Sequence, residues 1–473
     1  MVFNSLTFLI FFAVVMAVYH GPLSWTQRKG FLLVASYVFY AAWNPPFVLL
    51  LMGSTVIDWL VAKRIAATEQ PAARRALLLI SLGFNLGILG FFKYGGFLLD
   101  NFTRAMTTLG VHYQPPQWSI ILPIGISFYT FLTLSYTLDV YRRQLEPGNS
   151  FLDYAFFVTF FPHLVAGPIL RAADFLPQCV EPRRATRDQL GWGLALMAIG
   201  LFEKVVLADA LMAPVADQVY AKVSAAGFVD AWAGTLAFSG QIFLDFAGYS
   251  TCAIGAALCL GFVLPDNFRF PYAAIGFSDF WRRWHVSLST WLRDYIYIPL
   301  GGNRDGEAKA RRNLMITMLL GGLWHGASWR FVAWGGLHGS YLVGERMARS
   351  VWGGAAWLSH RTVRVGLGLL TFLMVCLTWV FFRAHSFGDA RRLLTTMLSG
   401  GSHDQLVLGA GNVLGVFAVT LLLLGSHWWM RESSLEARWQ AVPWWGRSLV
   451  LASLLLALFL VPGDDRAFIY FQF

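Results

Sequence analysis

A series of long apolar stretches, separated by short polar loops, runs through almost the whole sequence. The stretches recur from the N-terminal residues to about residue 462, and no long polar interval divides them. A helix needs about 20 mostly apolar residues to cross the hydrocarbon core of a bilayer. Candidate spans lie near residues 3–19, 30–42, 47–62, 76–94, 118–141, 151–166, 190–211, 233–262, 313–342, 365–383, 411–429 and 446–462. Some of these twelve stretches are too short, kinked or polar to span simply. We therefore expect an all-α polytopic membrane protein with about 11 transmembrane helices.

The composition excludes an ordinary water-soluble fold. Hydrophobic residues make up 57% of the 473 residues and charged residues only 13%, whereas soluble domains carry roughly 25% charge. The net charge of +10 comes from basic residues in short loops, which form no single basic patch. Loops on the cytoplasmic side of a membrane explain this distribution, so we expect membrane lipid and no nucleic acid as a partner.

The basic loops also predict an orientation. The first apolar stretch has no Lys or Arg ahead of it, so it lacks the basic start of a signal peptide and is expected to remain as a span. Positive loops face the cytoplasm, and the early ones fall on that side if the N-terminus is periplasmic. The same rule places the basic stretches 171–187 and 269–312 inside, which requires residues 151–166 to dip into the membrane and return. Beyond Arg346 every loop holds arginines, and the rule gives no orientation.

Two stretches contain residues that we expect to interrupt a helix. Pro162 and His163 lie within 151–166, and two glycine pairs, 321–322 and 335–336, lie within 313–342. Irregular backbone at membrane depth is tolerated only where protein or a water-filled cavity shields it. We therefore expect re-entrant segments there. Because no polar linker, soluble domain or clear repeat occurs, residues 1–473 are predicted to form one domain, with an aromatic tail at 463–473.

Residues 280–298 have the pattern of an amphipathic helix. Aromatic and leucine side chains recur on one face, and arginines fall on the other. Such a segment is typical of a helix that lies in the membrane interface. His285 sits at the edge of the aromatic face. Its ring either points toward a cavity or bridges the lipid headgroups and the core.

Two further histidines, His325 and His338, lie in an apolar, glycine-rich run. A charged group at such depth costs about 3 kcal/mol or more, and it is read as functional when it lines a cavity. The alternative is a polar contact between helices. Together with His285, they favour chemistry, because histidine can take a proton from a hydroxyl near neutral pH. The three histidines lack the i, i+4 spacing and nearby carboxylates of a HExxH site, so acyl transfer is preferred and no metal is expected.

Four sequence motifs carry a resemblance to a known family. They are WRRWHVSLSTWLRDYIYIPLGGNR at 281–304, NLMITMLLGGLWHGASW at 313–329, FFPHLVAGPI at 160–169 and DFAGYS at 245–250. In type and order they resemble the membrane-bound O-acyltransferase family, and most closely its bacterial polysaccharide branch, which includes the membrane component of alginate O-acetylation. The motif core spans about residues 120–345 within the single domain.

The resemblance implies a fold and a site. It implies a ring of transmembrane, re-entrant and interfacial helices around a thin central tunnel, which a cytoplasmic acyl donor enters from one side. The histidine of the family's WHG motif is His325, which would be catalytic together with His285 of the WHxSLS motif. His338, in a pattern with Trp334 and Gly335, would support them. The expected donor is acetyl-CoA, and the expected acceptor is an exported polysaccharide such as alginate, reached directly or through a periplasmic acetyltransferase partner at the bacterial inner membrane.

The C-terminal sequence FIYFQF allows two interpretations. It is too short to span a membrane, and aromatic residues favour an interfacial anchor. A resemblance to the FxYF-like tail proposed to relay acyl groups in related systems makes Tyr470 a transient acyl carrier instead.

Other functions stay open at this point. Within the family, D-alanyl transfer and the acetylation of cellulose or peptidoglycan are alternatives. A transporter or flippase for an acyl donor or lipid-linked sugar would need acidic partners at membrane depth, of which the chain offers chiefly Asp58, Asp139 and Asp245. A scaffold for an export complex gives no reason for the histidine motifs.

Overall fold

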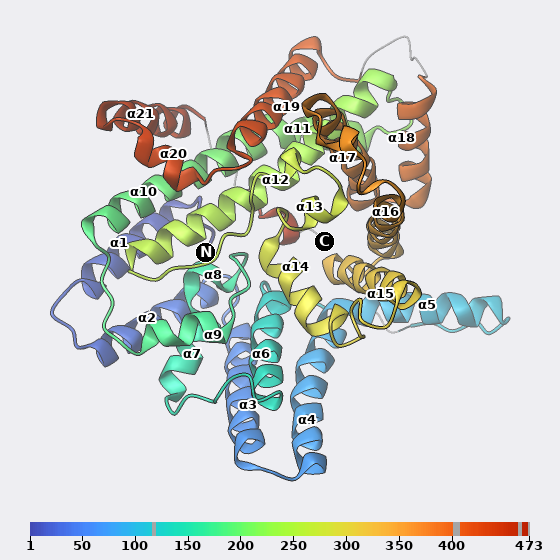
Figure 1. Cartoon of the computed structure of the whole chain (residues 1–473). Coiled ribbons are helices and arrows are strands. Elements are labelled where there is room, and N and C mark those ends of the chain that lie inside the picture. The colour runs from blue at the N-terminus through green and yellow to red at the C-terminus, as the bar shows by residue number, and fades with distance from the viewer. Residues whose placement is uncertain (116–119, 401–406, 462–465, 472–473) are drawn as a thin grey trace. The chain divides into compact units, whose positions relative to one another are not determined.

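The computed structural model describes residues 1–115, 120–400, 407–461 and 466–471, and no strand occurs among them (Figure 1). The expected all-α fold is confirmed. The chain divides into two compact units: unit 1 comprises Met1–Leu194 and Ala253–Pro265, and unit 2 comprises Ala195–Cys252 and Asp266–Phe473. That residues 1–473 act as one domain stays a prediction.

Unit 1 is built from the N-terminal helices. Its elements are α1 (Leu6–Tyr19), α2 (Trp25–Ala41), α3 (Phe47–Ala67), α4 (Pro71–Leu89), η1 (Gly90–Tyr94), α5 (Gly95–Thr108), α6 (Ile126–Tyr141), α7 (Phe151–Thr159), α8 (Phe161–Leu164), α9 (Ala172–Phe175), η2 (Leu176–Cys179) and the first part of α10 (Arg187–Leu201). Helices α3, α4 and α6 lie side by side (Figure 1).

Unit 2 holds the motif histidines. After the end of α10 its elements are η3 (Phe202–Met212), α11 (Ala213–Ala221), α12 (Phe228–Cys259, shared with unit 1), η4 (Pro271–Ala273), α13 (Phe277–Trp281), α14 (Val286–Leu292), η5 (Arg293–Tyr297), α15 (Glu307–His325), α16 (Trp329–Trp352), η6 (Ala356–Ser359), α17 (Arg361–Arg383), α18 (Phe387–Ser399), α19 (Ala410–Met430), α20 (Leu435–Ala441), α21 (Trp444–Leu460) and η7 (Ile469–Phe471).

Within the part of the chain that the structure describes, four helical segments are long and apolar enough to cross a membrane. They are Pro71–Thr108, which runs through α4, η1 and α5, and the helices α12, α17 and α19. Helices α1 and α21 are apolar but shorter. The remaining expected spans and the central tunnel stay predictions. The candidate at 118–141 begins at two residues outside the described part of the chain, and α6 begins at Ile126.

The interruption expected in residues 151–166 is present. Helix α7 ends at Thr159 and α8 begins at Phe161. The N–H of the Phe161 backbone donates to Ser36 Oγ at 3.0 Å, and the ring of His163 is buried with Nε2 3.0 Å from the Phe157 carbonyl oxygen. The polar groups at this break therefore have partners inside the protein, as a buried irregular segment requires.

The prediction that the two glycine pairs interrupt their helices is wrong. Helix α15 continues through 321–322 and α16 continues through 335–336, while the chain leaves helical geometry at 326–328. A glycine pair lowers helix propensity by only about 1 kcal/mol per residue. Packing between the two helices is sufficient to override that cost.

The glycines instead allow α15 and α16 to approach closely. A Cβ atom on Gly322 would lie 2.2 Å from the carbonyl oxygen of Phe331, and one on Gly335 would lie 2.2 Å from that of Met318. Small residues serve the same purpose at helix contacts in membranes. The two helices lie side by side in unit 2 (Figure 1), which fixes His325 at the end of α15.

Residues 280–298 do not form the single amphipathic helix that their pattern predicts. Helix α13 ends at Trp281, and α14 begins only at Val286. Between them His285 has a left-handed backbone, with φ of +43°. Trp284 and Trp291 are buried in the protein. Part of the aromatic face is therefore packed inside the protein. That the segment lies in the membrane interface stays a prediction.

Candidate active site around His325 and His285

His325 is the last residue of α15, and its side chain is buried, with 5% of its surface exposed. Its ring meets Trp334 edge on, with centroids 5.0 Å apart, and the Phe382 ring at 5.5 Å. Gly326 follows in an extended conformation, and a Cβ atom there would lie 2.1 Å from the Phe331 ring. The WHG motif thus places an imidazole within an aromatic cage at a helix terminus.

The helix terminus affects the charge that His325 can carry. The C-terminal end of an α-helix bears a partial negative charge and stabilises a nearby cation by about 0.3–1 kcal/mol, and by more when partly buried. A proton taken up by the His325 ring would therefore meet a favourable field from α15. This suits a general base, which becomes positively charged as the reaction proceeds.

His285 belongs to a hydrogen-bonded cluster. Its Nδ1 atom lies 3.0 Å from Oδ1 of Asn267, and the same oxygen accepts hydrogen bonds from Ser287 Oγ at 2.9 Å and from the Ser287 backbone N–H at 3.4 Å. Asn267 Nδ2 donates to Ser250 Oγ at 3.0 Å. A backbone N–H can only donate, so this Asn267 atom is the amide oxygen. It follows that Nδ1 of His285 carries the hydrogen.

This arrangement fixes the chemistry of the other ring nitrogen. In a neutral imidazole with the hydrogen on Nδ1, Nε2 bears a lone pair and accepts hydrogen bonds. His285 lies outside the four candidate spans, and its burial lowers the pKa of the ring. The ring is therefore neutral near pH 7.

His338 has the features of a supporting residue. It is fully buried, and its Nε2 lies 3.0 Å from Thr378 Oγ1, whose own hydrogen is donated to the Val375 carbonyl oxygen at 2.7 Å. Nε2 is therefore the donor in the contact with Thr378. The ring packs against Trp334 with centroids 4.6 Å apart, and Trp334 in turn contacts His325. His338 thus supports Trp334, one of the aromatic residues that surround His325.

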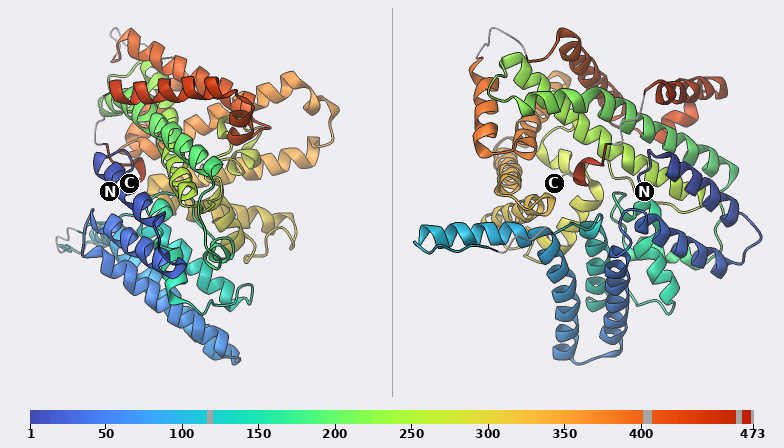
Figure 2. Two further views of the ribbon diagram at one scale, coloured as in Figure 1. Left: turned by 90° about the vertical axis from the view of Figure 1, so that its left-hand side faces the viewer. Right: turned by 180° about the vertical axis from the view of Figure 1, so that it is seen from behind.

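Tyr470 lies near both motif histidines, although it comes from the C-terminal tail. Its ring centroid is 5.5 Å from that of His325 and 4.8 Å from that of Phe246. The Phe246 ring is 4.6 Å from that of His285. Figure 2 shows the C-terminal segment beside α12, the helix that carries Phe246. The structure thus brings all four predicted site residues into unit 2.

Sequence reasoning missed two residues of this region. Asn267 sits in a loop without periodicity, so no local pattern marked it. Lys204 is a lone cation inside the apolar run 190–211, which was a usable signal because such residues usually have a buried partner. In the structure Lys204 Nζ lies 2.8 Å from Asp245 Oδ1. Asp245 was noted only as an acid at membrane depth.

Asp58, another acid noted from the sequence, lies in unit 1. Its buried carboxylate accepts hydrogen bonds from Ser81 Oγ and from Asn85 Nδ2, the latter at 2.8 Å. These contacts join α3 to α4. A buried carboxylate needs such partners to offset the loss of water, so its hydrogen bonds account for Asp58 as a packing element.

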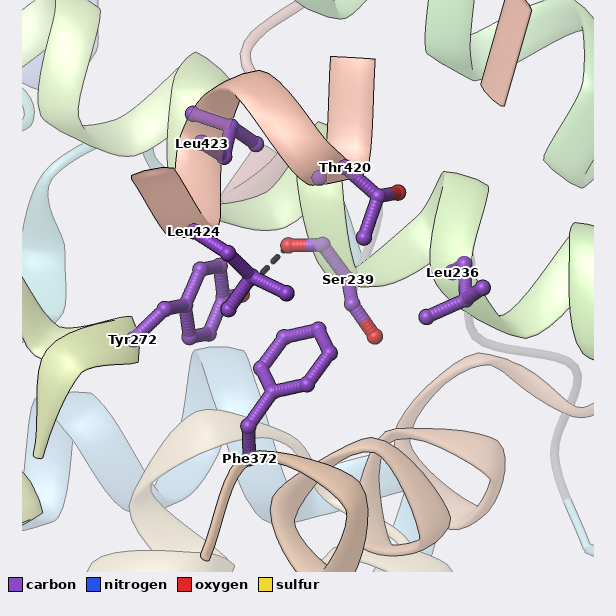
Figure 3. Close-up of a pocket in the computed structure, with 8 residues that line it drawn as sticks. Leu236, Ser239, Tyr272, Phe372, Thr420, Leu423 and Leu424 are labelled. Carbon is purple, nitrogen blue, oxygen red and sulfur yellow. Dashed lines mark hydrogen bonds between the residues drawn. The ribbon is translucent and has the colours of Figure 1, made fainter. Parts of the chain in front are cut away.

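A small cavity elsewhere in unit 2 contains none of the predicted site residues. It is lined by Leu236, Ser239, Gly240, Tyr272, Phe372, Thr420, Leu423 and Leu424 (Figure 3). The Tyr272 hydroxyl donates to the Ser239 carbonyl oxygen across it. The cavity has no space for a water molecule, so its mostly apolar walls are in close contact. Within the described residues, no three His, Cys, Asp or Glu side chains are grouped to hold a metal ion.

Comparison with known proteins gives consistent matches. The sequence profile of the membrane-bound O-acyltransferase family, MBOAT, matches residues 6–383. A probable alginate O-acetylase, AlgI, of Pseudomonas aeruginosa is 42% identical over 425 residues, which cover 89% of this chain and 80% of that protein. A peptidoglycan O-acetyltransferase of Helicobacter pylori is 36% identical over 493 aligned positions, covering 94% and 91%. A teichoic acid D-alanyltransferase of Bacillus subtilis is 26% identical over 288 residues, covering 58% and 73%.

The family match includes the elements that build the site. Residues 6–383 contain the WHxSLS and WHG motifs with His285 and His325, the Trp334 to His338 pattern and the α17 residues that close the cage. The family and the four long apolar helices together indicate a membrane protein. The chain belongs to the membrane-bound O-acyltransferase family and is an O-acyltransferase.

Proposed function

We propose that this enzyme transfers acetyl groups from acetyl-CoA on the cytoplasmic side of a bacterial inner membrane toward an exported polysaccharide such as alginate. The observation that carries the proposal is the position of His325, buried in an aromatic cage at the C-terminus of α15. The relatives named as alginate and peptidoglycan O-acetyltransferases support acetyl as the group that is transferred.

In the proposed reaction a hydroxyl oxygen attacks the thioester carbonyl carbon while His325 takes the hydroxyl proton. A new C–O bond forms, the C–S bond breaks, and the departing thiolate of CoA receives the proton from His325. General base catalysis of this kind contributes about 10²- to 10⁴-fold in rate. The field of α15 stabilises the imidazolium that exists between the two proton transfers.

His285 is proposed to orient the attacking hydroxyl. Because Asn267 holds the hydrogen on Nδ1, Nε2 offers a lone pair, and a lone pair accepts a hydrogen bond from a hydroxyl. The same nitrogen has no hydrogen to donate to a developing oxyanion. Orientation of the acceptor therefore fits His285 better than stabilisation of negative charge.

Tyr470 is proposed as the first acceptor. Its phenol oxygen would attack the thioester carbonyl, lose its proton to His325 and form an aryl ester, with CoA leaving as the thiol. The acceptor hydroxyl would then attack the ester, and the phenol would leave with a proton. The contact between the Tyr470 and His325 rings supports this order. An aryl ester is a good donor because a phenolate is a better leaving group than an alkoxide.

The proposal includes an orientation and a partner. We place the N-terminus in the periplasm because the early basic loops then face the cytoplasm. The acetyl group would emerge on the periplasmic side, where a separate periplasmic acetyltransferase could carry it to the polysaccharide. Membrane lipid surrounds the protein in this arrangement.

Peptidoglycan is a second candidate for the final acceptor. The Helicobacter pylori relative named for that activity aligns with 94% of this chain and over 91% of its own length, which is a larger share than the alignment with the Pseudomonas protein covers. The two acceptors can be compared by supplying alginate or peptidoglycan fragments, each with a matching soluble acetyltransferase, and by measuring ester formation.

The test uses the full chain in proteoliposomes with radiolabelled acetyl-CoA. We expect label to reach the protein or an added acceptor with the wild type, and His325→Ala to lower the rate at least about 100-fold. His427→Asn is the matched control, because that buried imidazole accepts a hydrogen bond from the Tyr272 backbone N–H at 3.2 Å and an amide oxygen can replace it. Equal labelling by His325→Ala would contradict the catalytic assignment of His325.

A further inference from the structure

Two carboxylates hold the C-terminal tail against unit 2. The Asp245 Oδ2 atom on α12 accepts the backbone N–H of Ile469 at 2.7 Å. The Asp217 Oδ2 atom on α11 lies 2.7 Å from Nη1 of Arg466. The two tail residues that these carboxylates hold, Arg466 and Ile469, are three positions apart and precede Tyr470.

The Asp245 anchor is part of a buried ionic cluster. Its Oδ1 atom lies 2.8 Å from Lys204 Nζ, which also lies 3.0 Å from Asp209 Oδ1. Each of these side chains has only 2–5% of its surface exposed. A buried carboxylate without a cation would tend to take up a proton and weaken as an acceptor. The Lys204 ammonium therefore stabilises the charged form of Asp245, the form that accepts most strongly from the Ile469 N–H.

The Asp217 anchor is tied to the wall of the cage. Its Oδ1 atom lies 2.7 Å from Nη2 of Arg383, the residue that follows Phe382 on α17. Phe382 contacts the His325 ring. One carboxylate thus joins the tail, through Arg466, to the helix that closes the site.

The two tail residues just before Tyr470 fill a defined space. Phe468 and Ile469 are each only 1% exposed. The Phe468 ring lies 5.5 Å from that of Phe246 and 5.0 Å from that of Tyr249. This burial packs the tail against α12, while the Asp245 hydrogen bond and the Asp217 ion pair hold it in place.

We propose that Asp245 and Asp217 are positioning residues that seat the C-terminal tail so that the Tyr470 ring meets His325. The inference rests on the proposed use of Tyr470 as the first acetyl acceptor. It goes beyond that proposal by assigning the groups that set the geometry, including Lys204 as the cation that holds Asp245.

The seating of the tail can be measured independently of acetyl transfer. Phe468→Cys places a reporter thiol at a buried position, and the four native cysteines are buried as well. We expect slow reaction of this thiol with a water-soluble maleimide in detergent. Asp245→Leu and Arg466→Gln should each speed the reaction at least about tenfold, because each removes a hydrogen bond that involves a charged group.

Matched variants distinguish a specific loss of the tail contacts from a general loss of folding. Asp209→Asn removes the other carboxylate partner of Lys204 but leaves the Asp245 acceptor in place, so the labelling rate should stay slow. On the tail side, Ile469→Pro removes the N–H that Asp245 accepts, whereas Ile469→Ala shortens the same side chain and keeps the N–H. Only the proline variant should release the tail and speed the labelling of the reporter thiol. These tail variants keep the test decisive if Asp245→Leu does not fold.

Three outcomes decide the matter. Faster labelling together with at least about tenfold slower acetyl transfer, at an unchanged KM for acetyl-CoA and an unchanged melting temperature, supports the inference. Unchanged labelling in Asp245→Leu, Arg466→Gln and Ile469→Pro overturns the anchoring. Faster labelling with full acetyl transfer overturns the positioning role. Failure of the proposed function itself is seen separately, as no acetyl transfer by the wild type while the labelling pattern holds.

Discussion

The Nδ1 atom of His285 lies 3.0 Å from the Oδ1 atom of Asn267, and this contact decides which nitrogen of the ring carries the hydrogen. The backbone N–H of Ser287 donates to the same oxygen, so the amide cannot be turned the other way. A loop residue thereby sets the tautomer of a motif histidine and makes Nε2 the acceptor nitrogen of the ring.

Asn267→Ala should slow acetyl transfer by about 100-fold, because the imidazole of His285 loses the contact that fixes its tautomer and orientation. Turnover by the purified enzyme in proteoliposomes measures the change. Ser287→Ala is the matched comparison, since it removes a hydroxyl that donates to the same oxygen and leaves the His285 contact. An effect of Ser287→Ala as large as that of Asn267→Ala would contradict the role of the tautomer.

Asn267→Asp should move the acidic limb of the pH–rate profile to higher pH. A carboxylate beside Nδ1 stabilises the protonated ring and raises the pKa of His285, so the neutral form appears only at higher pH. The rate at low pH then falls more than the rate at high pH. A profile that keeps the wild-type limb would show that the protonation of His285 does not limit the reaction.

Tyr470→Phe separates the relay from direct transfer. The substitution removes only the hydroxyl and keeps the ring that packs against His325 and Phe246. If the phenol is the first acceptor, stable labelling of the chain and net transfer both disappear while acetyl-CoA still binds. Labelling followed by gel separation and alkaline hydrolysis measures the ester. Transfer at the wild-type rate by this variant would show that the relay is wrong.

Gly322→Ala and Gly335→Ala should each destabilise the protein by about 1–3 kcal/mol, because the new methyl group meets backbone atoms at 2.2 Å and forces α15 from α16. Thermal unfolding in detergent measures the loss. Gly336→Ala is the control at the adjacent position, where the nearest atom would be 3.5 Å away on the Leu319 side chain. Equal melting temperatures for the Gly335→Ala and Gly336→Ala variants would contradict the close approach.

Thr378→Val should affect stability more than chemistry. The valine has nearly the shape of threonine but leaves the His338 Nε2–H without its acceptor in a buried site, which costs about 1–3 kcal/mol. We expect a lower melting temperature and a rate within about tenfold of the wild type, since His338 acts through packing on Trp334. A loss of rate as large as that of His325→Ala, with stability unchanged, would instead indicate a direct role for His338.

The apolar stretches and the histidine motifs were sufficient to predict the fold class and the family of this protein. The all-α fold and the family follow from them, because hydrophobic length and a long, ordered motif are local properties of the chain. The break near Pro162 was also local, since proline lacks the N–H that a helix needs.

Only the tertiary structure decided how the site is built. Residues 280–298 have a helical pattern, yet the chain breaks at His285 because the ring is held by Asn267 from a separate loop. The glycine pairs suggested breaks, but they sit in continuous helices because α16 packs against α15 at backbone distance. The sequence likewise could not place Tyr470 beside His325, because the contact depends on Asp245 and Asp217, which lie far from the tail in sequence. Local preferences specify elements, while contacts between distant residues specify where reactive groups meet.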